Sequence, residues 1–394
     1  MCKNAKIHLL VSTLFTFAMG LSNIFVNVFF WRQTNNFRIV VIYNMIQYIV
    51  IPLTFITAGN IAKRKNGILP MRLGLLFYAM FFIIILTIGG KGMLYIYLLG
   101  IVHGIAAGFY WLAFNTLCFD YTDTGNRDTF NGFNGSCAGV AAAGAPITAG
   151  YIISRFTGTA GYRIVFAVAL GIFVILIFIS LRLKCKNFAG RVDFKKAFGR
   201  NNEEWGTVKK ATTLWGMRDM VIVFVVNILI METTGSELSL GQLTLIASLL
   251  SSISYAAVQR FIKPPKRRLA IFIGTAGAFL AVSGLAFRVE YATLLFYIIL
   301  DALALPFFLV QLGSSTFNVI SRAHEENLRI EYMINKDIAL NSGRIISAAV
   351  LLLVTSITDS TSMLQGYLLF IGAAPLASGL LLGKLKKVLS GACQ

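Results

Sequence analysis

The stretch that decides the organisation of the chain is residues 182–219, "RLKCKNFAGRVDFKKAFGRNNEEWGTVKKATTLWGMRD". It is the longest segment without a sustained apolar run, and it is rich in lysine and arginine. Six apolar runs precede it and six follow it, and each run is long enough for a membrane-crossing helix of about 20 residues. The stretch therefore predicts a connection between two halves of six helices each.

The composition is that of a chain surrounded by lipid. Hydrophobic residues make up 57% of its 394 residues and charged residues only 13%, whereas a soluble domain has about a quarter charged residues. We therefore predict an all-α polytopic membrane protein, with twelve transmembrane helices in two pseudo-symmetric six-helix bundles. The predicted spans are residues 8–31, 38–62, 69–90, 93–118, 131–154, 161–182, 216–235, 239–260, 269–287, 291–317, 337–357 and 363–383. They imply an N-terminal bundle, a cytoplasmic linker and a C-terminal bundle over residues 1–182, 183–215 and 216–394.

Basic residues determine the orientation that we expect. The net charge of +19 would suggest a nucleic-acid partner in a soluble protein, but in a membrane protein it is typical of basic loops retained in the cytoplasm. With the N-terminus inside, the basic runs 63–66, 263–268 and 384–387 and the linker all fall on the inner side. We predict a multi-pass protein of the cytoplasmic membrane, with both termini cytoplasmic and no nucleic-acid partner. In the linker we expect a short surface helix whose Phe and Trp side chains reach the lipid headgroups.

The two halves show an internal repeat. The fourth and tenth spans align without a gap, "HGIAAGFYWLAFN" (103–115) against "DALALPFFLVQLG" (301–313), which pairs His103 with Asp301 and Gly108 with Pro306. Repeated halves are typical of secondary transporters, whose substrate site lies near the middle of the membrane between the repeats.

Three local motifs give the chain a family resemblance. They are "GNIAKRKNG" (59–67), "NRDTFNG" (126–132) and "GVAAAGAPITAG" (139–150). The chain resembles the major facilitator superfamily over its full length, and is most similar to the bacterial drug-exporter-like and lipid-flippase-like branches. The first motif lacks the family's usual aspartate, and Lys63 stands near that place. The resemblance implies two rocking bundles and gating roles for Gly59, Arg64, Gly67, Arg127, Gly139, Gly144, Pro146 and Gly150, although the small residues also fit simple close packing of helices.

Among the ionisable residues of the predicted spans, four are singled out as candidates, because a charge inside the membrane is costly and marks a functional hypothesis. They are Asp301, His103, Glu232 and Arg344. The resemblance implies that the fourth and tenth spans line the central cavity, which makes Asp301 and His103 candidates for proton coupling. Glu232, at the outer end of the seventh span, is a further candidate. Two alternatives remain open: Asp301 forms a permanent ion pair with Arg344 as its natural partner, or His103 makes only a hydrogen bond between helices.

Amides and aromatic side chains on the same spans are candidates for the substrate cavity. Together with Arg344 they are Asn23, Asn27, Tyr110, Trp111, Asn115 and Gln311. An aromatic and amide wall beside an acid suits an amphipathic or cationic organic substrate. The same aromatic rings are equally consistent with ordinary packing.

The sequence does not indicate an enzyme. It has no G-x-x-x-x-G-K-[ST] loop, no HExxH and no cysteine cluster, so neither ATP hydrolysis nor a metal site is encoded in these motifs. We expect no cofactor and a monomer that moves a small-molecule or lipid substrate with protons as the coupling ion. The leading hypothesis is proton-coupled export of a small amphipathic solute. One alternative is a flippase for a lipid-linked intermediate, in which Arg344 or Arg163 meets a phosphate, and another is a symporter for uptake. A receptor or a membrane enzyme is less favoured, because the sequence shows no nucleophile–base pair.

Overall fold

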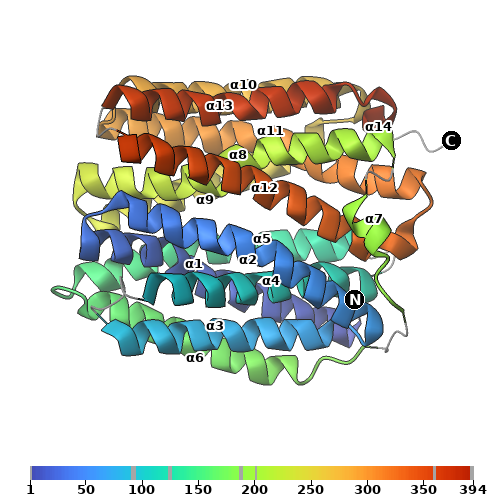
Figure 1. The fold of residues 1–394 in the computed structure, drawn as a ribbon, viewed down its shortest axis with the longest axis horizontal. Helices are drawn as coiled ribbons and strands as arrows, with labels where there is room; N and C mark the ends of the chain where they lie inside the picture. The colour runs from blue at the N-terminus through green and yellow to red at the C-terminus, as the bar shows by residue number, and fades with distance from the viewer. Residues whose placement is uncertain are drawn as a thin grey trace. The chain divides into compact units, whose positions relative to one another are not determined.

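The computed structural model describes residues 2–89, 95–122, 127–185, 190–199, 202–357 and 361–390, and within these ranges all regular structure is helical (Figure 1). Twelve of the described helices are long and apolar enough to cross a membrane, which confirms the predicted number of spans. They are α1 (Lys3–Thr34), α2 (Phe37–Arg64), α3 (Ile68–Ile88), α4 (Ile96–Asp120), α5 (Arg127–Ser154), α6 (Ala160–Ser180), α8 (Glu203–Thr234), α9 (Glu237–Phe261), α10 (Arg267–Phe287), α11 (Tyr291–Arg322), α12 (Arg329–Ile357) and α13 (Thr361–Gly383). The short helices α7 (Phe194–Phe198) and α14 (Lys386–Ser390) complete the set of labelled helices.

The chain divides into two compact units. The first is Met1–Val192 with Gly235–Leu245, and the second is Asp193–Thr234 with Ile246–Gln394, so α9 begins in the first unit and continues in the second. The same helix pairs pack within each unit: α1 on α5 and α6 and α3 on α4 and α6 in the first, and α8 on α12 and α13 and α10 on α11 and α13 in the second. The two halves therefore share one packing scheme, as the repeat predicts.

Two glycines show the repeat at atomic detail. A Cβ added to Gly74 of α3 would lie 2.7 Å from the backbone nitrogen of Tyr110, and one added to Gly274 of α10 would lie 2.5 Å from that of Phe308. Tyr110 and Phe308 are paired in the alignment of the fourth and tenth spans. In each unit a glycine thus allows one helix to approach the backbone of the next at the equivalent position.

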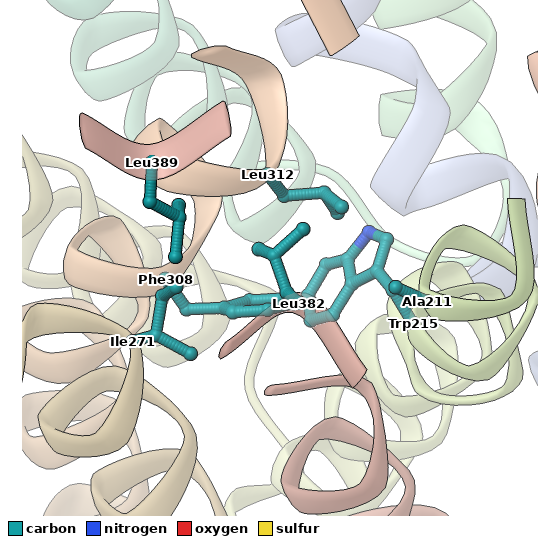
Figure 2. Close-up of a cluster of buried hydrophobic side chains, with 7 residues drawn as sticks. All are labelled: Ala211, Trp215, Ile271, Phe308, Leu312, Leu382 and Leu389. Atoms are coloured by element: carbon teal, nitrogen blue, oxygen red, sulfur yellow. The ribbon is translucent and has the colours of Figure 1, made fainter. Parts of the chain in front are cut away.

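Helix α8 begins at Glu203, well before the predicted start of the seventh span at residue 216. Residues 203–215 are too polar to register as a span, yet their apolar side chains recur at helical spacing. Trp205 and Val208 pack with Val319, Ile320, Tyr332 and Val388, while Ala211 and Trp215 join a cluster with Ile271, Phe308, Leu312, Leu382 and Leu389 (Figure 2). This burial extends α8 through what the sequence suggests is linker.

The linker contains the predicted short helix, α7, which is bound to the beginning of α12. Asn335 Nδ2 donates to the carbonyl oxygens of Ala197 (2.6 Å) and Gly199 (3.2 Å), and Asn335 Oδ1 accepts from Trp205 Nε1 at 3.0 Å. Trp205 and Trp215 are buried, so the expectation that linker tryptophans reach the headgroups is wrong. Each tryptophan instead contributes to the interior of the second unit.

A carboxylate in the connection between α11 and α12 helps to hold α7. Lys196 Nζ lies 2.5 Å from Glu325 Oε1, and the hydroxyl of Tyr332 donates to Glu325 Oε2. The hydrogen bonds from Lys196 and Tyr332 lower the pKa of Glu325 below its usual value.

The lowered pKa of Glu325 gives a prediction about the pH dependence of stability. A carboxyl group whose pKa is lower in the folded than in the unfolded protein contributes stability above the unfolded pKa and loses it as the pH falls through the folded pKa. We expect wild type to be more stable than Glu325→Gln at neutral pH, with the difference shrinking below about pH 4.3. Thermal unfolding of both proteins in detergent across this range is the measurement, and a difference independent of pH would contradict the prediction.

The Gly- and Pro-rich segment of α5 is a packing surface. A Cβ on Gly20 of α1 would lie 2.9 Å from the Cβ of Ala145, and one on Gly241 of α9 would lie 2.7 Å from the carbonyl oxygen of Pro146. A Cβ on Gly150 would collide with the carbonyl oxygen of Glu237. The contacts agree with the packing interpretation of this motif.

A second pair of glycines sets the distance between α8 and α12. A Cβ on Gly216 would collide with the carbonyl oxygen of Leu340, and one on Gly343 would collide with that of Thr213. We predict that Gly216→Ala destabilises the protein by about 1–3 kcal/mol, because a side chain there forces the two backbones apart.

The matched control is Gly313→Ala in α11, where nothing lies within 4 Å of an added Cβ. There the substitution is expected to be neutral or to stabilise by up to about 1 kcal/mol, since alanine favours the helix. The change in the free energy of unfolding of each variant is measured by chemical unfolding in detergent. Equal changes for Gly216→Ala and Gly313→Ala would show that the α8–α12 contact is not tight.

Candidate functional site: a charge network on α8, α11 and α12

The central element of the site is a buried ion pair between α8 and α11. The side chain of Arg218 is 1% exposed, and its Nη2 donates to Asp301 Oδ1 at 2.5 Å. Tyr297, one turn before Asp301, donates its hydroxyl to Asp301 Oδ2 at 3.4 Å. The ring centroid of Trp215 lies 5.9 Å from the Arg218 guanidinium carbon, which adds a cation–π contact. Both charges are thus compensated within the membrane-spanning part of the second unit.

A second ion pair joins the next residue of α8 to α12. Arg344 Nε donates to Asp219 Oδ2 at 3.0 Å, Arg344 Nη2 donates to the same oxygen, and Arg344 Nη1 donates to Asn341 Oδ1 at 3.2 Å. Arg218 and Asp219 are adjacent in sequence but pair with different helices. Helix α8 is therefore linked electrostatically to α11 and α12 at one level.

Asp337 is the acid of the network that is not held by a side-chain ion pair in the structure. Its Oδ2 is buried and has no hydrogen-bond partner among the described residues, and the cations that act on it are Arg344 and Lys336. Asp337, Asn341 and Arg344 are spaced by four and three residues, so they share one face of α12. A buried carboxylate oxygen without a donor is costly, and Asp337 is therefore the position of the network most open to a proton or a ligand.

The network is balanced in charge and is confined to the second unit. It holds three carboxylates and three cations: Asp219, Asp301 and Asp337 with Arg218, Lys336 and Arg344. Helices α1 and α8 both have 32 residues, and alignment from their first residues places Ala18 and Met19 opposite Arg218 and Asp219. Neither is charged, so the two repeats differ at this point.

The predicted partner of Asp301 was wrong. Arg344 pairs with Asp219, and the cation that pairs with Asp301 is Arg218. In the sequence, Arg218 and Asp219 lie at the very start of the predicted seventh span, directly after the polar linker, where charged residues are expected at the membrane surface. The apolar periodicity from Trp205 to Trp215, continued as one helix, is the signal that would have placed both residues in the interior of a longer helix rather than at its end.

His103 lies in the first unit, packed among aromatic side chains. It is 5% exposed, its Nδ1 is 2.7 Å from the hydroxyl oxygen of Tyr43, and its ring lies 4.8 Å from that of Phe81 and 5.4 Å from that of Tyr78. Tyr43 is in α2 and His103 in α4. These contacts favour the alternative in which His103 makes a hydrogen bond between helices.

The cavity candidates separate into packed and accessible side chains. Tyr110 stacks on Phe15 and is buried, and Asn27 accepts a hydrogen bond from Asn44 Nδ2 at 2.8 Å. Trp111 is 45% exposed, and Asn115, one turn later, is half-buried and donates to the Trp111 carbonyl oxygen at 2.9 Å. Of the two aromatic candidates on α4, Tyr110 is therefore packed in the interior and Trp111 is accessible.

The remaining predicted residues have varied environments. Gln311 is buried, with no hydrogen-bond partner for its Oε1 among the described residues, Asn23 is half-buried, and Glu232 is exposed. Gly59 and Arg64 lie in the last two turns of α2 and Gly67 directly precedes α3; the two glycines are buried and Arg64 is exposed. Gly139 and Gly144 of α5 are half-buried. The side chain of Arg127 lies outside the described part of the structure.

Twelve membrane-spanning helices in two similarly packed halves, with a charge network inside one half, define the class of protein: a polytopic membrane transporter. Residues 9–328 match the sequence profile of the Major Facilitator Superfamily, and the chain belongs to that family. Members transport their substrates by alternating access, and the chain is a multi-pass membrane protein.

Two curated bacterial relatives share substantial sequence. Uncharacterized protein YqgE of Bacillus subtilis (strain 168) is 35% identical over 352 residues, covering 89% of this chain and 82% of that protein. Uncharacterized protein in sodM 3'region of Geobacillus stearothermophilus is 44% identical over 158 residues, covering 40% of this chain and 74% of that protein.

Solved structures share the fold at low sequence identity. A bacterial homologue of the iron transporter ferroportin in the inward-facing state matches with a TM-score of 0.71 and 16% identity, covering 98% of each chain. The outward-facing state matches with a TM-score of 0.65 and 16% identity, covering 97% of this chain and 99% of that chain. These matches confirm the predicted fold.

Proposed function

We propose that the protein is a proton-coupled transporter that exports a small amphipathic cation across the cytoplasmic membrane, with both termini on the cytoplasmic side. The observation that carries the proposal is Asp337, a half-buried acid beside Arg344 whose Oδ2 is itself buried and has no partner among the described residues. Intramembrane acids of this kind are common proton relays in transporters.

Charge balance suggests how protons and a cation exchange. When all three acids are ionised the network is neutral, and an added proton leaves it with one excess positive charge. A cationic substrate and a proton therefore compete for the same carboxylate, because binding both would leave uncompensated positive charge in a medium of low dielectric constant. Competition of this kind is the physical basis of antiport.

The ion pairs favour a cation over a lipid phosphate. A flippase for a lipid-linked intermediate requires a cation free to meet phosphate, whereas Arg218 and Arg344 each pair with a carboxylate. The same residues would serve a symporter, and only the direction of movement separates the two.

A second candidate substrate is a transition-metal ion. His8 is buried in α1, and its Nε2 lies 3.5 Å from the Sγ of Cys118 in α4. Zinc bonds of about 2.3 Å to sulfur and about 2.0–2.1 Å to nitrogen at tetrahedral angles separate the two ligand atoms by about 3.5 Å. The ferroportin homologue, which has a structure with soaked iron, shares the fold.

The test is transport by the purified protein in liposomes with an imposed pH gradient. We expect ethidium, a fluorescent amphipathic cation, to accumulate in vesicles with an acidic lumen and to be released by a protonophore. Empty liposomes control for passive entry. Movement of Zn²⁺ or Fe²⁺ in place of ethidium, lost in Cys118→Ser, would favour the second candidate. Ethidium accumulation that does not depend on the pH gradient would contradict proton coupling.

A further inference from the structure

Helix α7 has one face bound to the protein. Ala197 is buried and its carbonyl oxygen accepts from Asn335, Lys196 pairs with Glu325, and the backbone nitrogen of Asp193 donates to Glu331 Oε1 at 3.0 Å. Asn335 and Glu331 belong to the first two turns of α12. The position of α7 is therefore fixed relative to the helix that carries Asp337 and Arg344.

The opposite face of α7 is apolar and basic. Phe194 and Phe198 are 51% and 56% exposed, and their rings stack with centroids 6.4 Å apart. They are four residues apart and so lie on one side of the helix. Lys195, between them in the sequence, is also exposed. We call Phe194, Lys195 and Phe198 the α7 face.

We propose that the α7 face is a docking surface for anionic phospholipid. Exposed rings next to an exposed cation are unfavourable in water and suit the boundary between headgroups and acyl chains, where the rings are buried and the cation meets phosphate. Attraction of lysine and arginine to anionic headgroups adds to this. Phe198 precedes the first residue of α8 by five positions, so the face lies at the linker end of a helix that continues into the membrane.

Docking of lipid has a consequence for the charge network. Because Asn335 and Glu331 join α7 to α12, lipid bound to the α7 face stabilises the arrangement of α12 in which Asp337 and Arg344 are positioned. The protein is therefore sensitive to the headgroup charge of the membrane. This inference does not depend on the identity of the substrate.

The test compares phosphatidylglycerol with phosphatidylcholine, added to the full-length protein in detergent. For wild type, we expect phosphatidylglycerol to raise the unfolding temperature and to slow amide hydrogen exchange over residues 193–199, and phosphatidylcholine to do neither. The double variant Phe194→Ser with Phe198→Ser, and separately the single variant Lys195→Gln, are expected to lose both responses.

The matched control is Phe287→Ser with Arg288→Gln, another exposed phenylalanine beside an exposed arginine. The control is expected to keep both responses. Equal responses of wild type to the two lipids would overturn the proposal. Retention of the phosphatidylglycerol response by either α7 variant would also overturn it, because the rings and the cation are both required.

Discussion

Arg218→Ala is expected to destabilise the protein by about 3–5 kcal/mol, the largest stability effect of any single substitution in the second unit. The reason is that Asp301 would be left as an uncompensated acid in the spanning region, with only the hydroxyl of Tyr297 remaining as a donor to it. Chemical unfolding of the purified protein in detergent measures the change. A second variant, Arg218→Met with Asp301→Leu, removes both charges and is expected to recover most of the lost stability.

The control for this prediction is Arg288→Ala at a surface ion pair. The Arg288 and Glu290 side chains are 77% and 43% exposed, and exposed pairs contribute about 0–1 kcal/mol. The double variant Arg218→Met with Asp301→Leu lacks both charges, so it should fold but transport substrate poorly. A loss for Arg218→Ala no greater than that for Arg288→Ala would show that the Arg218–Asp301 pair is hydrated rather than buried.

Asp337→Asn is expected to abolish proton coupling while leaving the fold intact. Asparagine has nearly the same shape as aspartic acid but cannot exchange a proton, so substrate-driven proton movement in liposomes should fall by about a hundredfold, the lower range for a positioned proton-transfer group. Stability should be unchanged or improved, because the substitution removes an acid whose buried Oδ2 has no donor among the described residues.

The control for Asp337 is Asp120→Asn, a half-buried acid at the end of α4 in the first unit. It should leave proton movement within about twofold of wild type, since surface substitutions away from buried networks have small effects. If both variants lose proton movement equally, the loss is not specific to the α12 network. If Asp337→Asn moves protons normally, Asp301 becomes the candidate proton carrier.

The fold could be predicted because each membrane-spanning helix is recognised from the mean hydropathy of a run of about 20 residues. Twelve apolar runs and a basic linker predict the number of helices, and the repeat predicts that the two halves pack alike. The beginnings of α8 and α12 could not be predicted in this way, since residues 203–215 and 329–336 are polar segments that become helical by burying one face. Tertiary packing, which hydropathy does not measure, decides those boundaries.

The site could be predicted only in part, and the reason is the same. Asp301 and Arg344 stand out as charges inside apolar runs, but Arg218, Asp219 and Asp337 lie at the polar edges of their runs and resemble loop residues. Their burial depends on the helix extensions. His103 illustrates the opposite error, because a polar residue inside an apolar run can be satisfied by one neighbour, here Tyr43.

The most direct test of the central proposal is proton release on substrate binding in lightly buffered detergent solution, followed with a pH indicator. If a cation and a proton compete for Asp337, wild type should release protons as ethidium binds, and Asp337→Asn should bind ethidium without releasing any. Equal release from both proteins, or saturating binding to wild type with no release, would contradict a coupling role for the α12 acid.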